Sequence, residues 1–239
     1  MAEKMNESAK QWQIWVDRGG TFTDLVARRP DGEIVTHKLL SENPDQYEDA
    51  ALQGVRDLLG LAKSDDIPAE QIDAVKMGTT VATNALLERK GEPLALITTE
   101  GFRDALRIGY QTRPKLFALH IELPEMLYQK VIEVKERVGA NGEMILPLDR
   151  EDVRAKLQAA YDEGLRACAI VFMHGYRFSD HEKAVADIAK EIGFTQISTS
   201  HETSPLMKLV SRGDTTVVDA YLSPILRRYV DRVASELGD

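Results

Sequence analysis

Three short runs rich in apolar and β-branched residues, separated by polar turns, occur near the start of the chain. They cover residues 12–17, 24–29 and 34–40, and this pattern predicts three consecutive β-strands. Pro30-Asp31-Gly32 supplies the turn between the second and third runs. The first forty residues are therefore expected to form a three-stranded meander.

Helical periodicity follows this meander. Tyr47, Ala51, Val55 and Leu58 recur at helical spacing, which predicts a helix that Asn43-Pro44 starts and Gly60 ends. The same reading predicts further elements in the order strand 72–78, helix 81–90 ending at Gly91, buried strand 94–98 and a helix from 101.

A second α/β pattern occupies the later part of the chain. Asp149 is the expected cap of a helix through Glu163, and residues 168–173 form a buried strand. Ser179 and Glu182 form a capping box for a helix that ends at Gly193. A strand over 194–199 comes next, and the last segment is helical with one break at Ser223-Pro224.

The element order of residues 12–106 is that of the ribonuclease-H-like half of actin-type ATPases and sugar kinases. The predicted fold class is therefore α/β, with such an N-terminal half and an additional α/β subdomain. The expected organisation is a ribonuclease-H-like subdomain over 1–106, a second α/β subdomain over 107–199 and a helical segment over 200–239.

Composition narrows the function classes. The 239 residues carry a net charge of −9, which disfavours binding to nucleic acid through its phosphates. Cys168 is the only cysteine, so an intrachain disulfide is excluded. It lies in an apolar run and is expected to be a core residue. With neither a membrane-span-length apolar stretch nor an apolar signal core, a cytoplasmic location without a membrane partner is expected.

Residues 17–24, Asp-Arg-Gly-Gly-Thr-Phe-Thr-Asp, carry the strongest chemical signal. Gly19 and Gly20 let main-chain N–H groups approach an anion, and the hydroxyls of Thr21 and Thr23 are expected on one side of the strand. A carboxylate such as Asp17 fits a phosphate site if a divalent metal lies between them. A plain tight hairpin turn also explains the glycines, but does not require the two threonines.

A second candidate lies at the junction of strand 72–78 and helix 81–90. Gly78, Thr79 and Thr80 stand where a helix begins, and unpaired N–H groups at such a position attract anions. A threonine at this place is also sufficient as an ordinary N-cap. The functional interpretation predicts that this helix end faces the same cleft as the Gly19-Gly20 hairpin.

Other polar residues give weaker signals. Arg113 precedes a proline, and its guanidinium suits carboxylate binding, although most loop arginines are simply solvated. His174 and His201 follow strands and could act as acid or base, but a structural role is the favoured account of each. The histidine spacing has no metal-binding signature.

The chain resembles the hydantoinase/oxoprolinase family, and is most similar to its ATP-hydrolysing 5-oxoprolinase branch. The ordered motifs that carry the resemblance include DRGGTFTD at 17–24, MGTTVATNALLERKGE at 77–92, GFRDALRIGYQTRPKLF at 101–117 and AIVFMHGYRF at 169–178. The long C-terminal motif SHETSPLMKLVSRGDTTVVDAYLSPILRRYV at 200–230 completes the set.

The resemblance implies an enzyme that uses ATP and Mg²⁺ to open the lactam of 5-oxo-L-proline to L-glutamate, and so a place in glutathione metabolism. It implies that Asp17 holds Mg²⁺ directly or through water. The implied catalytic residues are Asp17, Thr21 and Thr23, and the two threonines cradle the γ-phosphate together with Gly19 and Gly20. The implied ATP-binding residues are Arg18, Gly19, Gly20, Gly78, Thr79 and Thr80. Asn84 and Arg113 are the implied substrate residues, with Arg113 on the carboxylate.

The sequence departs from an actin-type ATPase after residue 214, where no second phosphate loop or adenine site occurs. The chain is therefore expected to be inactive alone and to work with a second ATPase half and a hydrolytic half, as an oligomer when full length. An ATP-dependent hydantoinase or a ketone carboxylase subunit is the alternative within the family. A non-catalytic docking module is the other alternative, its apolar surface formed by Tyr221, Leu222, Ile225, Leu226, Tyr229 and Val230.

Overall fold

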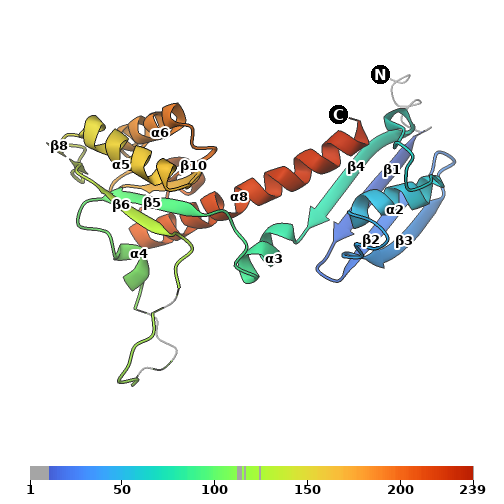
Figure 1. The fold of residues 1–239 in the computed structure, drawn as a ribbon, viewed down its shortest axis with the longest axis horizontal. Helices are drawn as coiled ribbons and strands as arrows, with labels where there is room; N and C mark the ends of the chain where they lie inside the picture. The colour runs from blue at the N-terminus through green and yellow to red at the C-terminus, as the bar shows by residue number, and fades with distance from the viewer. Residues whose placement is uncertain (1–10, 112–114, 116, 124, 239) are drawn as a thin grey trace. The chain divides into compact units, whose positions relative to one another are not determined.

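The computed structural model describes residues 11–111, 115, 117–123 and 125–238. The chain divides into two compact units, each described by itself below (Figure 1). The first unit comprises Met1–Glu88 and Ile225–Asp239, and the second comprises Arg89–Pro224. These boundaries differ from the expected ones after residues 106 and 199, because the strand that follows residue 93 belongs to the second sheet.

The first unit contains a four-stranded sheet in the order β3-β2-β1-β4. Its strands are β1 (Trp12–Arg18), β2 (Phe22–Arg28), β3 (Ile34–Leu40) and β4 (Ile72–Thr79). The first three strands form the predicted antiparallel meander, and β4 runs parallel to β1 (Figure 1). The mixed α/β architecture and this strand order agree with the expected ribonuclease-H-like half.

One face of this sheet forms the core of the first unit. Ile14 and Val16 of β1 and Leu25 of β2 are almost fully buried, whereas the residues between them point to the other face. The helix α2 (Ala50–Leu59) covers the apolar face through Val55. Tyr229, from the end of the last helix, joins the same cluster. The alternation of buried and exposed positions therefore leaves the second face of β1 free to carry polar groups.

The helix α2 begins later than expected. Asn43 pairs with Tyr47 in an isolated bridge, and the helix starts at Ala50 with Asp49 as its N-cap. The Asp49 carboxylate accepts hydrogen bonds from the N–H groups of Ala51 and Leu52 at 2.9 and 3.2 Å. A side-chain acceptor for these N–H groups stabilises a helix start, and Asp49 supplies it here.

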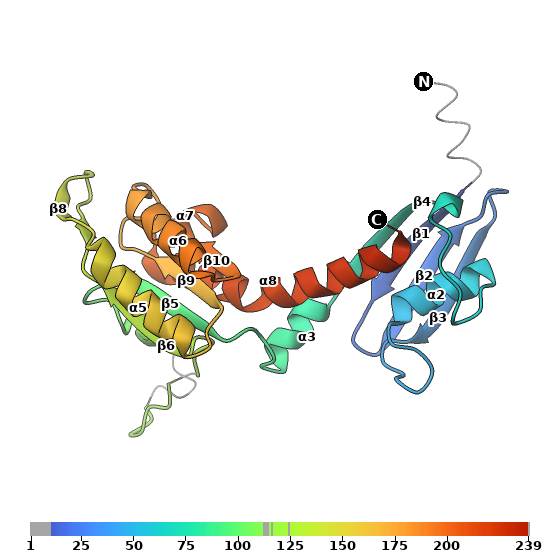
Figure 2. The same ribbon diagram turned by 45° about the horizontal axis from the view of Figure 1, so that its top comes forward.

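The second unit contains a parallel sheet in the order β10-β9-β5-β6. The helices α5 (Arg150–Asp162) and α6 (Asp180–Ile192) pack on one face of it, as Figures 1 and 2 show. The central strand β5 was expected in the first subdomain; it belongs here because all six of its residues are buried between β6 and β9. The strands are β5 (Leu94–Thr99), β6 (Lys130–Val134), β9 (Ala167–Val171) and β10 (Gln196–Thr199).

Short elements complete the chain. A hairpin of β7 (Arg137–Val138) and β8 (Met144–Leu146) turns at Asn141-Gly142. Cys168 is buried in β9, as predicted. The remaining elements are η2 (Ala69–Gln71), α3 (Val81–Leu87), α4 (Ala105–Ile108), α7 (Ser200–Thr203) and α8 (Leu209–Leu237).

The last helix, α8, differs from its prediction. It runs through Pro224 instead of restarting there, and the boundary between the two units falls directly after this proline. Two members of the apolar set proposed for docking, Tyr221 and Tyr229, are each only 6% exposed, so they are core residues. Among the described residues, no helix combines the length and the apolar character that a bilayer crossing requires.

Candidate functional site

Asp17 lies on the polar face of the first sheet, where β1 ends. It pairs across the sheet with Asp24 of β2 and with Gly78 of β4. Lys38 of β3 is paired with Asp24 and binds its carboxylate at 2.6 Å. Asp24 thus already has a counter-charge, while Asp17 is exposed and has neither a hydrogen bond nor an ion pair with another described residue. A Cβ on residue 78 would lie 3.7 Å from Asp17 Oδ1, so glycine there keeps the space beside this carboxylate open.

The turn that follows, the β1–β2 loop of residues 19–21, is tightly closed. The Gly19 N–H donates to the Phe22 carbonyl at 3.0 Å. A Cβ on residue 19 would lie 2.9 Å from that carbonyl oxygen, which is closer than real Cβ atoms come. Glycine is therefore required at position 19 by close approach of the backbone.

The start of α3 meets this loop, as the sequence predicted. The N–H and the hydroxyl of Thr80 both donate to the Arg18 carbonyl, at 3.1 and 3.2 Å. The Asn84 amide nitrogen lies 3.4 Å from the position that a Cβ on Gly20 would occupy. Gly20, Thr80 and Asn84 therefore share one corner of the first unit.

Several donors in this corner have no partner within the described part of the chain. The N–H groups of Gly20 and Thr21 donate to none of its residues, and Gly20 and Thr21 are exposed. The side chain of Asn84 also makes no hydrogen bond there. Two free backbone N–H groups and a free amide, close to an exposed carboxylate, are suited to an anion that a cation bridges to Asp17.

Thr23 differs from its expected role. It is fully buried on the core face, and its hydroxyl lies 3.0 Å from that of Ser41, whereas Thr21 is exposed. Ser41 also donates its hydroxyl to the Gly19 carbonyl at 2.7 Å and its N–H to the Thr21 carbonyl at 2.9 Å. Thr23 and Ser41 thus hold the loop in shape. Nothing in the sequence pattern singles out Ser41 beyond its place in a polar turn.

Arg18 also points away from the loop. Its Nε atom lies 3.9 Å from the Asp49 carboxylate, and its guanidinium stacks 5.1 Å from the centre of the Tyr229 ring. Asp49 receives a second cation, Arg232, at 3.3 Å. Burial raises the pKa of Tyr229 to about 12, with Asp49 adding to the effect and the two arginines opposing it. In this conformation Arg18 is a structural cation between β1, α2 and α8.

Thr79 and the helix α3 complete this corner. Thr79 accepts a hydrogen bond from the Val81 N–H at 3.2 Å, so it caps the first turn of α3. That helix has only seven residues and ends at Leu87 instead of Lys90. Arg113 lies outside the described residues. No group of three or more His, Cys, Asp or Glu side chains within the described ranges could hold a metal by themselves.

A second polar group lies at the carboxyl ends of the strands in the second unit. Glu182 is fully buried and accepts hydrogen bonds from the Phe172 N–H at 2.9 Å and the Ser200 hydroxyl at 2.5 Å. Its other oxygen lies 3.0 Å from His201 N and 2.8 Å from His201 Nδ1. The predicted capping box is therefore wrong: Ser179 makes no capping hydrogen bond, because its partner Glu182 ties β9 to β10 instead.

His174, His181 and His201 of the second unit have structural partners. His174 Nδ1 lies 2.7 Å from the Val138 carbonyl, and His181 Nδ1 lies 2.7 Å from the Glu136 carboxylate. The fully buried Arg212 donates to the carbonyls of Phe172, Met173 and Leu206. Desolvation lowers the pKa of Arg212, and the nearby Glu182 opposes this effect. We assign these groups to the stability of the second unit.

The known proteins with similar sequences are much longer than this chain. Its alignment with a 5-oxoprolinase of Dictyostelium discoideum is 272 positions long, shows 41% identity, and covers 99% of this chain and 21% of that protein. It is 41% identical to 5-oxoprolinase 1 of Arabidopsis thaliana, with 94% and 20% covered. The acetophenone carboxylase gamma subunit of Aromatoleum aromaticum is 33% identical, with 87% and 31% covered. The chain thus spans about a fifth of the 5-oxoprolinases that it matches.

Two solved structures have the same fold as this chain over most of its length. The ATP-dependent caprolactamase of Pseudomonas jessenii superposes with a TM-score of 0.77 at 28% identity, covering 95% of this chain and 34% of that one. A nucleotide-free acetone carboxylase gives a TM-score of 0.73 at 20% identity with 94% and 34% covered, which supports the fold alone. Residues 13–193 match the family model described as the hydantoinase/oxoprolinase N-terminal region. The chain therefore belongs to the hydantoinase/oxoprolinase family, as its N-terminal region.

Proposed function

We propose that this chain provides the γ-phosphate-binding part of a larger ATP-dependent enzyme that opens the lactam of 5-oxo-L-proline to L-glutamate. The observation that carries the proposal is the corner where the β1–β2 loop meets the start of α3. The free N–H groups of Gly20 and Thr21, the Asn84 amide and the Asp17 carboxylate lie there. The similarity to 5-oxoprolinases over most of the chain supports the choice of substrate.

The chemistry explains why a lactam hydrolase needs such a corner. A lactam is a resonance-stabilised amide and a poor electrophile. Transfer of the γ-phosphoryl group to its carbonyl oxygen breaks the terminal P–O bond of ATP and releases ADP. Water then adds to the activated carbon, the C–N bond breaks with the electron pair going to nitrogen, and a second water releases phosphate from the acyl phosphate. The first step depends on positioning and charge neutralisation, which rigid N–H donors provide.

Asp17 fits a magnesium ion that keeps most of its water shell. Mg²⁺ is commonly held by one or two carboxylates together with the phosphates of the nucleotide. The exposed Asp17 carboxylate beside Gly78 offers one such ligand, directly or through water. The ion would neutralise charge on the β- and γ-phosphates. Thr23, Ser41, Thr80 and Arg18 would then keep the loop in shape instead of contacting the nucleotide.

The test is phosphate release from ATP, stimulated by 5-oxo-L-proline, in the enzyme that contains this chain with its remaining regions. Asp17→Asn and Gly20→Val should each lower kcat by about a hundredfold or more, because both disturb groups that act in the transition state. Asp31→Asn, in the exposed turn between β2 and β3, is the matched control and should leave kcat unchanged.

Two results would contradict the proposal. One is full 5-oxo-L-proline-dependent activity in the Asp17 and Gly20 variants. The other is phosphate release that hydantoin or a ketone stimulates and 5-oxo-L-proline does not. The second result would favour the candidate that the similarity to the acetophenone carboxylase gamma subunit supports, an enzyme that activates a ketone or hydantoin oxygen in the same way.

The remaining expectations form part of the same proposal. The 239-residue chain, which lacks a recognisable second phosphate loop, would not turn over ATP alone. It would act with a second ATPase half and a hydrolytic half, in an oligomeric cytoplasmic enzyme of glutathione metabolism. The non-catalytic docking alternative predicts that Asp17→Asn has no effect on phosphate release, so the same assay distinguishes it.

A further inference from the structure

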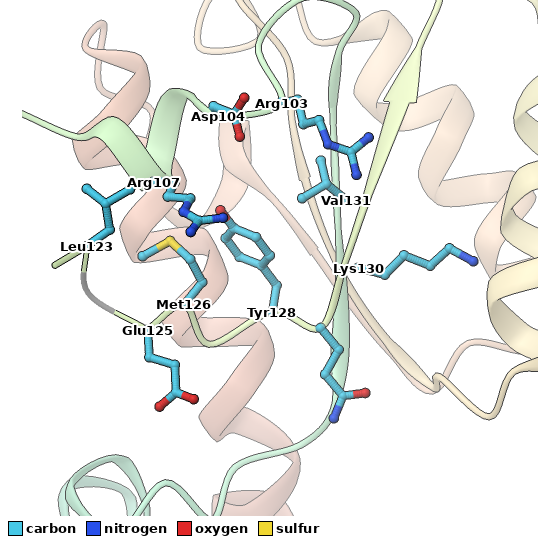
Figure 3. Close-up of a pocket in the computed structure, with 10 residues that line it drawn as sticks. Arg103, Asp104, Arg107, Leu123, Glu125, Met126, Tyr128, Lys130 and Val131 are labelled. Carbon is cyan, nitrogen blue, oxygen red and sulfur yellow. The ribbon is translucent and has the colours of Figure 1, made fainter. Parts of the chain in front are cut away.

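A hollow of about 670 Å³ lies in the second unit, away from the polar network around Glu182. It is bordered by α4 and by the segment that leads into β6 (Figure 3). An adjoining hollow of about 390 Å³ lies between α4 and the start of α8. The two share Arg107 and Leu123 in their linings, so the Arg107 side chain borders both.

The cations around the larger hollow differ in their partners. Lys130 binds Glu163 at 2.5 Å, and Figure 3 shows its side chain directed away from the hollow. Arg103 lies 3.7 Å from Glu133. Arg107 has no ion pair or hydrogen bond within the described ranges, and in Figure 3 its guanidinium points toward the hydroxyl of Tyr128. Arg107 is thus the cation that remains available to a ligand.

Tyr128 complements Arg107. Its hydroxyl makes no hydrogen bond to another described residue. Burial raises the pKa of this phenol, Asp104 and Asp214 add to the effect, and Arg107 opposes it. The phenol therefore stays protonated at neutral pH and can donate a hydrogen bond. A guanidinium and a phenol that point together form a donor pair for one anionic group.

Four carboxylates line the two hollows and limit which anion fits. Asp104 and Glu125 border the larger hollow, and Glu122 and Asp214 border the smaller one. In Figure 3 the Glu125 side chain is directed away from Arg107 and Tyr128, whereas Asp104 and Asp214 act on the Tyr128 phenol. A dianion such as phosphate would be repelled by these carboxylates. A ligand with one carboxylate can accept hydrogen bonds from Arg107 and Tyr128. If it also carries a nearby N–H group, that group can donate to the carboxylate of Asp104 or Asp214.

We propose that the Arg107–Tyr128 pair binds the carboxylate of a small amino-acid-derived ligand, with the lactam or amine N–H directed toward Asp104 or Asp214. The choice of 5-oxo-L-proline as this ligand rests on the proposed function. Arg107 then determines specificity, because it distinguishes a lactam that carries a carboxylate from a simple cyclic amide. Arg113, which the sequence favoured for this task, lies outside the described residues.

The experiment measures binding to the 239-residue chain without ATP, by isothermal titration and ligand-observed NMR. The probes are 5-oxo-L-proline, 2-pyrrolidinone (the same ring without the carboxylate) and inorganic phosphate. Arg107→Met should weaken 5-oxo-L-proline binding by about tenfold or more, and Tyr128→Phe by about threefold or more, as loss of a charged and a neutral hydrogen bond predicts. Arg103→Met is the matched control, because Arg103 also borders the larger hollow but lies 3.7 Å from Glu133.

The wild-type chain should bind 5-oxo-L-proline at least about tenfold more tightly than 2-pyrrolidinone, which lacks the charge-assisted contact. Phosphate should bind more weakly than 5-oxo-L-proline. No detectable 5-oxo-L-proline binding, equal binding of the two lactams, preference for phosphate, or an Arg107→Met variant that binds like wild type would each overturn the proposal. Circular dichroism of each variant confirms that it is folded.

The same titration separates this inference from the proposed function. Asp17→Asn lies in the other unit and should leave 5-oxo-L-proline binding unchanged. If the hairpin variants keep full phosphate release while Arg107→Met loses binding, the proposed phosphate site fails and the carboxylate site stands. If the hairpin variants lose phosphate release and Arg107→Met binds normally, the reverse holds.

Discussion

Replacement of Glu182 by glutamine tests how much of the second unit's stability depends on one buried carboxylate. The four donors at Glu182 come from three places: the end of β9 at Phe172, Ser200, and His201, which contributes two. A glutamine of the same size keeps one oxygen acceptor but replaces the other with an NH₂ group. That NH₂ group would face the backbone N–H of Phe172 or of His201, which can only donate, so at least that hydrogen bond is lost.

The size of the effect follows from burial. Each buried donor left without an acceptor costs about 1–3 kcal/mol. Loss of a buried ionic partner near the fully buried Arg212 adds to this cost. We therefore expect Glu182→Gln to lower the free energy of unfolding of the second unit by about 3–5 kcal/mol. That is a large part of the total stability of a typical domain, which is about 5–15 kcal/mol.

The assay has to resolve the two units. Both tryptophans, Trp12 and Trp15, lie in the first unit, so tryptophan fluorescence does not report on the second. Hydrogen exchange measured by mass spectrometry across a urea series gives a local free energy for peptides from β9 and β10. Peptides from β1 in the same samples serve as an internal reference and should be unaffected.

Glu191→Gln is the matched control, because it lies on the same helix and removes the same charge. Its partner is Arg154, and the Glu191 side chain is 57% exposed, so the change should cost less than about 1 kcal/mol. The reasoning is refuted if both variants shift β9 and β10 equally. If Glu182→Gln does not fold, Ser200→Ala removes one of the donors and should cost about 1 kcal/mol.

Two further predictions concern single side chains. Ser41→Ala should lower the free energy of unfolding of the first unit by about 1–3 kcal/mol, because it removes the bonds to Gly19 and Thr23, and tryptophan fluorescence should show a lower urea midpoint. Exposed Ser64→Ala is its control, and equal midpoints would contradict the account. Burial raises the pKa of the Cys168 thiol to about 12, so the folded state holds this proton while the unfolded state loses it. The stability of the second unit should therefore fall as the pH rises from the ordinary thiol pKa toward about 12. Cys168→Ala should reduce that fall, and iodoacetamide should label Cys168 only in urea; rapid labelling of the native chain would show that the thiol is accessible.

Local pattern predicted most of the elements of the fold. The meander at the start of the chain, the buried strand at Cys168 and the cap at Asp149 depend on residues close in sequence, and the structure contains all three. One error, the capping box at Ser179, occurred because a distant partner decided the outcome. Glu182 satisfies every local requirement of a capping box, yet it is more stable as the acceptor for groups from β9 and from the segment after β10.

In the candidate site, too, some features follow from local sequence and others from residues distant in the chain. The glycines of the β1–β2 loop and the threonines before α3 were predictable, because a turn and a helix start require particular residue types. Their meeting through the Thr80–Arg18 contacts agrees with the prediction. Ser41 was missed because its importance comes from contacts to Gly19 and Thr23, about twenty residues away.

The sequence by itself determined the family and the α/β class and named candidate residues for an anion site, since these depend on residue type and local spacing. Only the tertiary structure decided which of these candidate residues keep N–H groups without a hydrogen-bond partner in the described part of the chain. Packing and sheet pairing direct Arg18 and Thr23 into the interior and leave Gly20, Thr21 and Asp17 exposed. The same packing placed β5 in the second sheet, because a strand with every side chain buried needs neighbours on both edges and cover on both faces.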